Sequence, residues 1–402
     1  KSSLLTSSNA TNDLYVDPRS SRYADIDTGS YRMMTAEHLR VLDACEQRIL
    51  LIDTPFDRHV HEARVPFDQI NYFTDFFEHY ADVLPEIQAG ETRLVFMFSD
   101  AWNTVNQLET HEEYSGNLLA LDLYNICRRA CQQAGVLDNS VFCVPTSTRG
   151  VVQHEDWPIV YYNEPFNRYF ALPRHPVRMD YWEKHFFWLN RRTRRHRLYA
   201  IHQAYCAGIF DSAVWTFHDY DEVGNDRAWY AKELAVYGIT EPNYGFEQLR
   251  TTANHLGEYN VQADVQHQQE LANLKTWADT CAVEIVSEYM GSDKKVFLTE
   301  KIARSIVMGK PFIVLGDRGM LAELRSLGFT TFSDFWDESY DELPTIQQRI
   351  DRALEVAVDY MRTKDLSSGY SDLMIKQLEH NQQHYYGAYQ AQQIANFARA
   401  VQ

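Results

Sequence analysis

The chain has 402 residues, of which 45% are hydrophobic and 13% aromatic, which is enough for two domains of ordinary size with substantial cores. Its formal net charge of −18 argues against a protein covered with basic surface for nucleic acid, although it leaves room for a local basic cleft. No apolar run approaches the ~20 residues that span a bilayer, and the first residues lack the apolar centre of a signal peptide.

The six cysteines are scattered and form no C-x-x-C pair. We therefore expect buried, reduced thiols, which are typical of the cytosol. The sequence predicts a soluble cytoplasmic protein, located in the host cytoplasm in the case of a viral protein.

The first half of the chain alternates predicted strands and helices. Residues 1–35 are rich in Ser, Asn and Asp and are predicted to form a loosely held arm. Strands are predicted at residues 48–53, 93–99, 141–145 and 159–162, and helices at residues 67–83 and 118–134. This alternation predicts a Rossmann-like domain over residues 1–175.

Carboxylates follow the first two predicted strands. Asp53 and Asp100 end these strands, and Asp57 lies shortly beyond the first. The carboxyl ends of parallel strands are where open α/β sheets gather ligands. Each of these carboxylates alone is also typical of an ordinary strand end.

A second α/β series follows a proline-containing break at residues 173–177, where we place the linker between domains. Strands are predicted at residues 186–189, 213–217, 282–286 and 312–315, and helices at residues 198–207, 298–308, 345–361 and 372–399. Residues 224–265 are acidic and Tyr-rich, as in an insertion or a helical lid. We expect a second Rossmann-like domain over residues 176–370 and a C-terminal helix over residues 371–402.

An arginine-rich turn follows the first strand of this second series. Residues 190–197 read N-R-R-T-R-R-H-R, with five arginines in seven positions. Guanidinium groups match the geometry of phosphate oxygens, which favours a diphosphate as the ligand of this turn. The alternative is a solvated basic loop.

A second polar group lies between the strands at 282–286 and 312–315. Glu288 follows the first of these strands, and the first turn of the next helix carries Thr299, Glu300 and Lys301. Free backbone N–H groups and the positive end of the helix dipole favour an anion there. Lys301 suits a phosphate, and Glu300 suits two ribose hydroxyls. The alternative is a surface helix with a capping carboxylate.

These residues carry a resemblance to a known family. An acidic residue after a strand, an aromatic residue ahead of a T-E-K helix start, and a Gly-Pro-strand-Gly sequence resemble the donor site of the α1,3-fucosyltransferase family. That likeness covers about fifty residues, and the L-N-R-x-x-R-x-H-R turn is similar to one in viral, including bacteriophage, and bacterial relatives. The family implies the GT-B fold, with two Rossmann-like domains facing a cleft and a C-terminal helix that returns to the first domain.

The resemblance also implies roles for single residues at the donor site. Arg191 and Arg194 would bind phosphate, Lys301 the diphosphate, Glu300 the ribose and Phe297 the base, with Glu288 lining the pocket and Thr299 at the positive helix end. Phe297 stands where these fucosyltransferases often have Tyr, and Glu288 lies where Asn is common, so uracil and guanine both stay open as the base.

The function implied is transfer of a hexose or pentose from a UDP- or GDP-sugar to an acceptor hydroxyl, without a metal or another cofactor. Arginine, lysine and the helix dipole would stabilise the departing diphosphate. Inversion requires a general base in the first domain. Asp100 and Asp53 are the candidates, followed by Asp57 and Glu155.

Three readings of the acceptor and of catalysis stay open. The acceptor is a hydroxymethylated pyrimidine in viral DNA, as frequent viral relatives suggest, or a glycan or cell-surface polysaccharide. Alternatively, the chain is a non-catalytic protein that binds nucleotide sugars.

Other motifs predict less. The sequence has no G-x-G-x-x-G, G-x-x-x-x-G-K-[ST], H-E-x-x-H or G-x-S-x-G. Asp219 and Asp221 form a D-Y-D after a predicted strand, as in metal-dependent GT-A enzymes, but the arginines and lysine already supply the positive charge. His380 and His384 have metal-ligand spacing and supply only two ligands.

Overall fold

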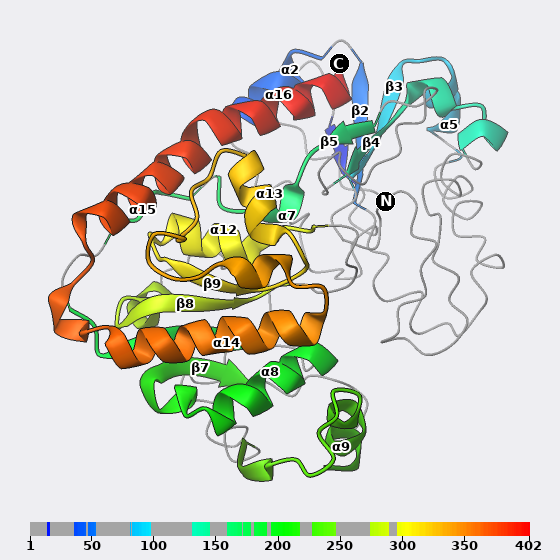
Figure 1. Ribbon diagram of the computed structural model, residues 1–402. Helices are drawn as coiled ribbons and strands as arrows, with labels where there is room; N and C mark the ends of the chain where they lie inside the picture. The colour runs from blue at the N-terminus through cyan, green and yellow to red at the C-terminus, as the bar shows by residue number, and fades with distance from the viewer. Residues whose placement is uncertain are drawn as a thin grey trace. The chain divides into compact units, whose positions relative to one another are not determined.

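A computed structural model describes the chain over part of its length. The described residues are 14–16, 36–45, 47–53, 81, 83–97, 131–144, 159–170, 172–177, 181–190, 194–217, 227–246, 274–288 and 296–402. They form two compact units (Figure 1). The first unit comprises Lys1–Ala171 and Ala388–Gln402, and the second comprises Leu172–Gly387.

The first unit contains a five-stranded parallel sheet. Its strands are β1 (Leu14–Val16), β2 (Arg48–Asp53), β3 (Thr92–Met97), β4 (Ser140–Val144) and β5 (Ile159–Tyr161), in the order β1-β2-β3-β4-β5. The short strand β1 corrects the prediction of an arm without strands, because Leu14 pairs with Ile49 of β2. Three residues are too few to show the period-two pattern that predicts a strand.

Helices from separate parts of the chain belong to the described portion of the first unit. They are α2 (Ala36–Asp43), α5 (Leu84–Gln88), α7 (Glu164–Asn167) and α16 (Gln390–Val401). Phe397 and Val401 of α16 pack with Val95 and Val141 of the sheet in one buried cluster. The prediction that the C-terminal helix returns to the first unit is confirmed.

The second unit contains a four-stranded parallel sheet in the order β7-β6-β8-β9. Its strands are β6 (Lys184–Asn190), β7 (Ala213–Phe217), β8 (Cys281–Ser287) and β9 (Phe312–Leu315). Every residue of β8 and β9 is buried, as expected for parallel strands covered on both faces. The predicted fold class, α/β with two parallel sheets, is confirmed.

Six helices are described in the second unit. They are α8 (Arg195–Cys206), α9 (Arg227–Ala235), α12 (Glu300–Val307), α13 (Met320–Ser326), α14 (Ile346–Thr363) and α15 (Asp372–His384). The helices α12 and α14 cover opposite faces of the sheet (Figure 1). None of the helices in the described ranges has the length and apolar character needed to cross a membrane.

Two helix predictions need correction. The helix α8 begins at Arg195, so part of the arginine-rich sequence lies in a helix and not in a turn. The single helix predicted over residues 372–399 is interrupted between α15 and α16, where Gly387 has non-helical dihedral angles of φ −111° and ψ −105°.

The strand order of the second unit reverses at one place. The chain passes from β6 to β7 on one side and then places β8 on the other side of β6. Ligands of open α/β sheets bind outside the carboxyl ends of the strands at such a reversal. The carboxyl ends of β6 and β8 are therefore where a ligand of this unit is expected.

The described cysteines form no disulfide. Cys45, Cys131, Cys143 and Cys281 are buried, whereas Cys206 is exposed. Burial raises the pKa of the Cys131 and Cys143 thiols to about 12, so these two side chains stay protonated at neutral pH.

Candidate functional site

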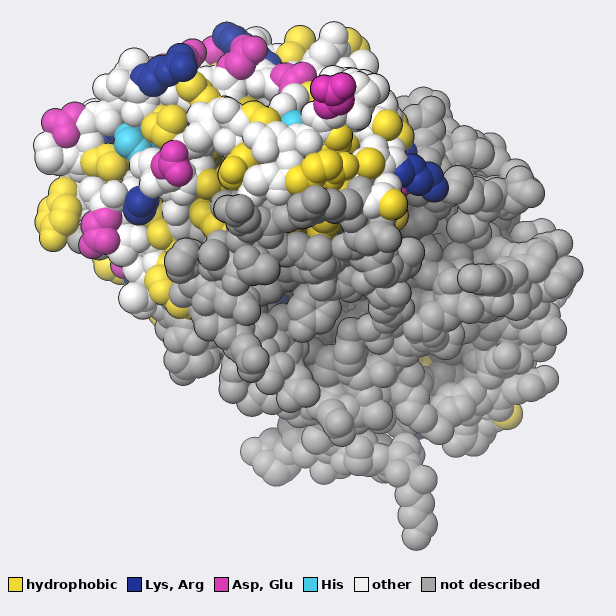
Figure 2. All heavy atoms as spheres, turned by 90° about the horizontal axis from the view of Figure 1, so that it is seen from below, with side chains coloured by type: hydrophobic (Ala, Val, Ile, Leu, Met, Phe, Trp, Pro, Cys, Tyr) yellow, Lys and Arg dark blue, Asp and Glu magenta, His cyan; other side chains and the backbone are white. Residues whose placement is uncertain are grey.

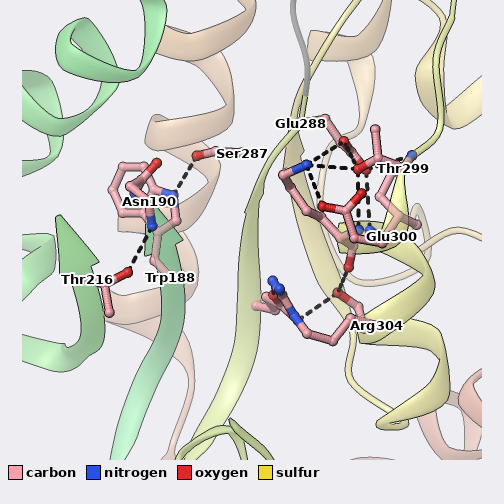
Figure 3. A network of polar contacts seen from close by, with 12 residues as sticks. Trp188, Asn190, Thr216, Ser287, Glu288, Thr299, Glu300 and Arg304 are labelled. Carbon is pink, nitrogen blue, oxygen red and sulfur yellow. Dashed lines mark hydrogen bonds and ion pairs between the residues drawn. The ribbon is translucent and has the colours of Figure 1, made fainter. Parts of the chain in front are cut away.

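The carboxyl ends of β6 and β8 lie side by side in the second unit. Trp188 of β6 pairs with Ile285 of β8, which places Asn190 level with Ser287 at the ends of the two strands. The indole Nε1 of Trp188 donates a buried hydrogen bond of 2.8 Å to Ser287 Oγ (Figure 3). This bond fixes the two strand ends against each other.

One arginine of the segment that follows β6 meets the end of β8. Nη2 of Arg197 donates to the backbone oxygen of Ser287 at 3.4 Å. Arg194 precedes the first residue of α8, is half-buried, and makes no side-chain cap, while Arg191 lies outside the described residues. The two motifs that are far apart in the sequence therefore lie together at the reversal of the strand order.

One of the five arginines is already neutralised. Nε of Arg195 donates to Oε2 of Glu233 in α9 at 2.5 Å, and both side chains are largely buried. This ion pair joins the start of α8 to α9, the helix predicted only as part of an insertion. Arg195 is therefore engaged in an ion pair within the protein.

Glu288 binds the start of α12. Its side chain is fully buried and accepts hydrogen bonds from the backbone N–H groups of Thr299 at 3.2 Å and Ile302 at 3.3 Å. It also accepts the Thr299 hydroxyl at 2.6 Å (Figure 3). The Thr299 hydroxyl oxygen in turn caps the N–H of Lys301. Backbone donors that the sequence suggested as an anion site are therefore occupied by protein groups.

Glu300 and Lys301 form the more accessible part of this helix start. Nζ of Lys301 lies 3.1 Å from Oε1 of Glu300 and 3.8 Å from Oε2 of Glu288, and the Lys301 and Glu300 side chains are 24% and 27% exposed. Two carboxylates and one ammonium group give this turn a charge of about −1. Such a turn suits hydroxyl groups better than it suits a diphosphate.

A buried ion pair that the sequence analysis missed fixes α12 on the sheet. Glu284 of β8 is fully buried, and it binds Arg304 and accepts the Ser305 hydroxyl at 2.7 Å. Glu284 and Glu288 are four residues apart in a strand, so they face the same side. Two glutamates at this spacing in an otherwise apolar strand are the signal that could have predicted two contacts with one helix. Phe297, just before α12, is also buried.

Of the expected general bases, only Asp53 lies within the described residues, and only its backbone is described. Asp53 is the last residue of β2 and pairs with Met97 at the end of β3, so its backbone lies at the carboxyl edge of the first sheet. The side chain of Asp53 lies outside the described part of the chain, as do the whole residues Asp57, Asp100 and Glu155.

Of the two alternative metal motifs, only the histidine pair lies within the described residues. Asp219 and Asp221 lie outside the described residues. The imidazoles of His380 and His384 stack in parallel and contact the backbone oxygens of Gly328 and Leu327 at 3.1 and 2.7 Å. Within the described ranges, no three His, Cys, Asp or Glu side chains form a group suited to a metal ion.

Comparison with known proteins shows a distant structural likeness. No protein-family model matches the sequence, and no curated protein matches it. Among solved structures, the pneumococcal O-GlcNAc transferase GtfA, in complex with UDP and GlcNAc, is similar over 92% of this chain with 11% sequence identity and a TM-score of 0.40. The chain spans 58% of the length of that protein's chain. A likeness of this extent does not place the chain in a family.

Proposed function

We propose that this protein is a GT-B glycosyltransferase that transfers a sugar from a nucleotide-diphosphate donor to an acceptor hydroxyl, with inversion and without a metal. The donor binds in the second unit, where the strand order reverses between β6 and β8. The observation that carries the proposal is the bond from Arg197 to the backbone oxygen of Ser287, which joins the arginine-rich start of α8 to the strand that leads to α12.

The diphosphate and the ribose of the donor bind to different groups of the site. Arg191 and Arg194 bind the diphosphate, because Glu288 already occupies the start of α12. Glu300 binds ribose hydroxyls, and Lys301 balances the charge of the Glu300 carboxylate. Glu288 and Thr299 hold the helix start in place, and Phe297 lies beside the base.

The chemistry follows from this arrangement of charge. Departure of the nucleoside diphosphate develops negative charge, which arginine side chains held in place before the reaction stabilise. Asp100 or Asp53 of the first unit removes the proton of the acceptor hydroxyl as the general base. The sugar is attacked on the face opposite the diphosphate, so its configuration inverts.

Transfer assays test the proposal directly. We expect the protein to bind UDP or GDP in calorimetry and to hydrolyse or transfer at least one member of a panel of UDP- and GDP-sugars. Binding without turnover of any donor or acceptor would support the non-catalytic alternative. Absence of binding to both nucleotides would overturn the proposal.

Substitution at the donor site separates its residues. Arg194→Ala, Lys301→Ala and Glu300→Ala should each weaken nucleotide binding about tenfold, which corresponds to ~1.4 kcal/mol, and leave the thermal midpoint within a few degrees. Lys376→Ala, at an exposed lysine of α15, is the control and should change nothing. Unchanged affinity in all three site variants would show that the site is wrongly placed.

The general base is tested in the same assay. Replacement of the catalytic carboxylate, as Asp100→Asn or Asp53→Asn, should lower the rate of transfer by about 10²–10⁴ with donor affinity unchanged. If both variants retain the wild-type rate, another residue is the base.

The charge of the chain favours a glycan acceptor over DNA. The formal net charge is −18, and on the face drawn in Figure 2 acidic and basic side chains of the described residues are interspersed. A DNA acceptor must release counterions on binding, so its affinity falls steeply with salt. Salt-sensitive competition by duplex DNA in the transfer assay would therefore support a hydroxymethylated pyrimidine instead.

A further inference from the structure

Asn190 carries a buried carboxamide that lacks a hydrogen bond. The residue is 2% exposed, and its Oδ1 has no hydrogen-bond partner among the described residues. Its backbone N–H donates to Thr216 Oγ1 at 3.1 Å. A buried polar atom without a partner destabilises a fold and is rare in native proteins, so its presence calls for a cause such as a ligand.

The position of Asn190 coincides with the expected ligand site. It is the last residue of β6, directly before the arginine-rich segment, at the reversal of the strand order. Side chains alternate along a strand, so Asn190 faces the same side as Trp188. The nearby hydroxyl oxygens of Thr216 and Ser287 already accept hydrogen bonds from Asn190 N–H and from Trp188 (Figure 3).

The chemistry of a carboxamide narrows the ligand group. Its oxygen needs a hydrogen from the ligand, and its NH₂ group offers hydrogens in return. Ionised phosphate oxygens have no hydrogen to give, so a diphosphate alone cannot satisfy Asn190. A sugar hydroxyl both donates and accepts, and it is joined covalently to the diphosphate that the neighbouring arginines suit.

We propose that the side-chain carboxamide of Asn190 binds a hydroxyl group of the nucleotide-sugar donor. This inference rests on the proposed function. The hydroxyl belongs either to the ribose or to the transferred sugar, and the two sources share the same chemistry. Asn190 is in either case a binding residue that holds the donor next to its diphosphate.

The test compares Asn190→Leu with wild type in binding calorimetry. The probes are inorganic pyrophosphate, UDP and GDP, their 2′,3′-dideoxy forms, and the corresponding nucleotide sugars. Affinity for pyrophosphate should not change. If Asn190 contacts the ribose, Asn190→Leu should bind UDP or GDP about tenfold more weakly than wild type does. The variant and wild type should then bind the dideoxy form equally well. A contact with the transferred sugar should weaken only binding of the intact nucleotide sugar.

The thermal midpoint is a second measurement, and it would fall if Asn190 had a structural role. The carboxamide makes no bond in the described fold, so Asn190→Leu should keep or raise the thermal midpoint. The matched control is Asn381→Leu: Asn381 is equally buried in this unit, but it bonds Thr330 through both side-chain atoms. That variant should lose about 4 °C or more and keep the wild-type donor affinity. Asn190→Ala replaces Asn190→Leu if the larger side chain prevents folding.

The outcomes separate this inference from the proposed function. If wild type binds UDP or GDP and both Asn190 variants bind every probe equally well, only the role of Asn190 is overturned. Equal weakening for pyrophosphate, for normal nucleotides and for dideoxy nucleotides would overturn it too, because the lost partner would not be a hydroxyl. If wild type binds neither nucleotide nor nucleotide sugar, the proposed function falls with it.

Discussion

The carboxylate of Glu288 takes the place of the anion that a helix N-terminus attracts. It accepts two backbone N–H groups and one hydroxyl from the first turn of α12. A negative ligand group at the same donors would have to displace it. The positive charge available to a diphosphate therefore comes from the start of α8.

Removal of this carboxylate gives a prediction at the residue scale. Glu288→Ala leaves the N–H groups of Thr299 and Ile302 without their acceptor and should lower the free energy of unfolding by about 2 kcal/mol. Chemical denaturation measures this loss. A change below about 0.5 kcal/mol would mean that water replaces the carboxylate without loss, contrary to the buried position of Glu288.

Gly328 allows a second residue-scale prediction. It has φ +94°, and a Cβ there would lie 2.7 Å from Nε2 of His384. Gly328→Ala should therefore lower the free energy of unfolding by about 2–4 kcal/mol. Gly319→Ala is the matched control, because Gly319 has φ +83° and open space around the added atom. It should lose only about 1–2 kcal/mol.

A double substitution separates the two causes at Gly328. In a His384→Ala background the added methyl group no longer meets an imidazole, so the further loss from Gly328→Ala should shrink to the control value. An equal loss in both backgrounds would assign the whole effect to the backbone. Urea unfolding of the four variants completes the cycle.

At the scale of elements, buried side-chain bonds attach α12 to β8 and to the residue that follows it. Glu288, directly after the strand, binds the first turn of the helix, and Glu284 of the strand binds the second. The helix start is thereby held at the strand end next to Ser287. These buried contacts hold Glu300 and Lys301 in position.

The buried pair predicts a large loss of stability. Glu284→Ala removes the carboxylate that binds the largely buried Arg304 and should lower the free energy of unfolding by about 3–5 kcal/mol. The surface pair of Glu355 and Arg352 is the control, since Glu355→Ala should cost less than about 1 kcal/mol. Similar losses in both variants would contradict the argument from burial.

Sequence patterns predicted the elements that bury apolar side chains. The strand β9 was predicted with its observed limits, and β8 with an error of one residue at each end. Periodicity could not reveal β1, because it has three residues. It also could not reveal that α8 begins at Arg195, because charged residues at a helix start read like a loop.

The long-range hydrogen bonds of the candidate site could not be predicted from the sequence. Helix capping by Thr299 follows from local sequence. Its bond with Glu288 joins residues 11 positions apart, and that of Arg197 with Ser287 joins residues 90 apart. Contacts between residues so far apart depend on the order of the strands in the sheet, and a single sequence does not predict that order. The orphaned carboxamide of Asn190 is visible only once its surroundings are known.

At the scale of the whole molecule, the first unit should be sensitive to acid. Burial outweighs the nearby Glu37 carboxylate and lowers the pKa of His38 from 6.5 to about 4, while its Nε2 lies 3.1 Å from the Tyr162 hydroxyl. Between pH 6.5 and 4 the unfolded chain binds a proton that the folded unit does not. Stability should therefore be complete above pH 6.5 and fall by up to about 3 kcal/mol as the pH drops to 4.

His38→Leu tests this dependence. The variant should lose less stability than wild type between pH 6.5 and 4, because it has no imidazole to titrate. Denaturant unfolding followed by a probe in the first unit measures the difference. Equal slopes in wild type and variant would show that other groups cause the acid sensitivity.

The crossing of the chain back into the first unit has a consequence for biosynthesis. A ribosome makes Leu172–Gly387 entirely before it makes α16. Phe397 and Val401, which pack against Val95 and Val141, leave the exit tunnel after the whole of the second unit. The unit that is begun first is therefore finished last, and the first unit of a nascent chain cannot close until α16 has been made.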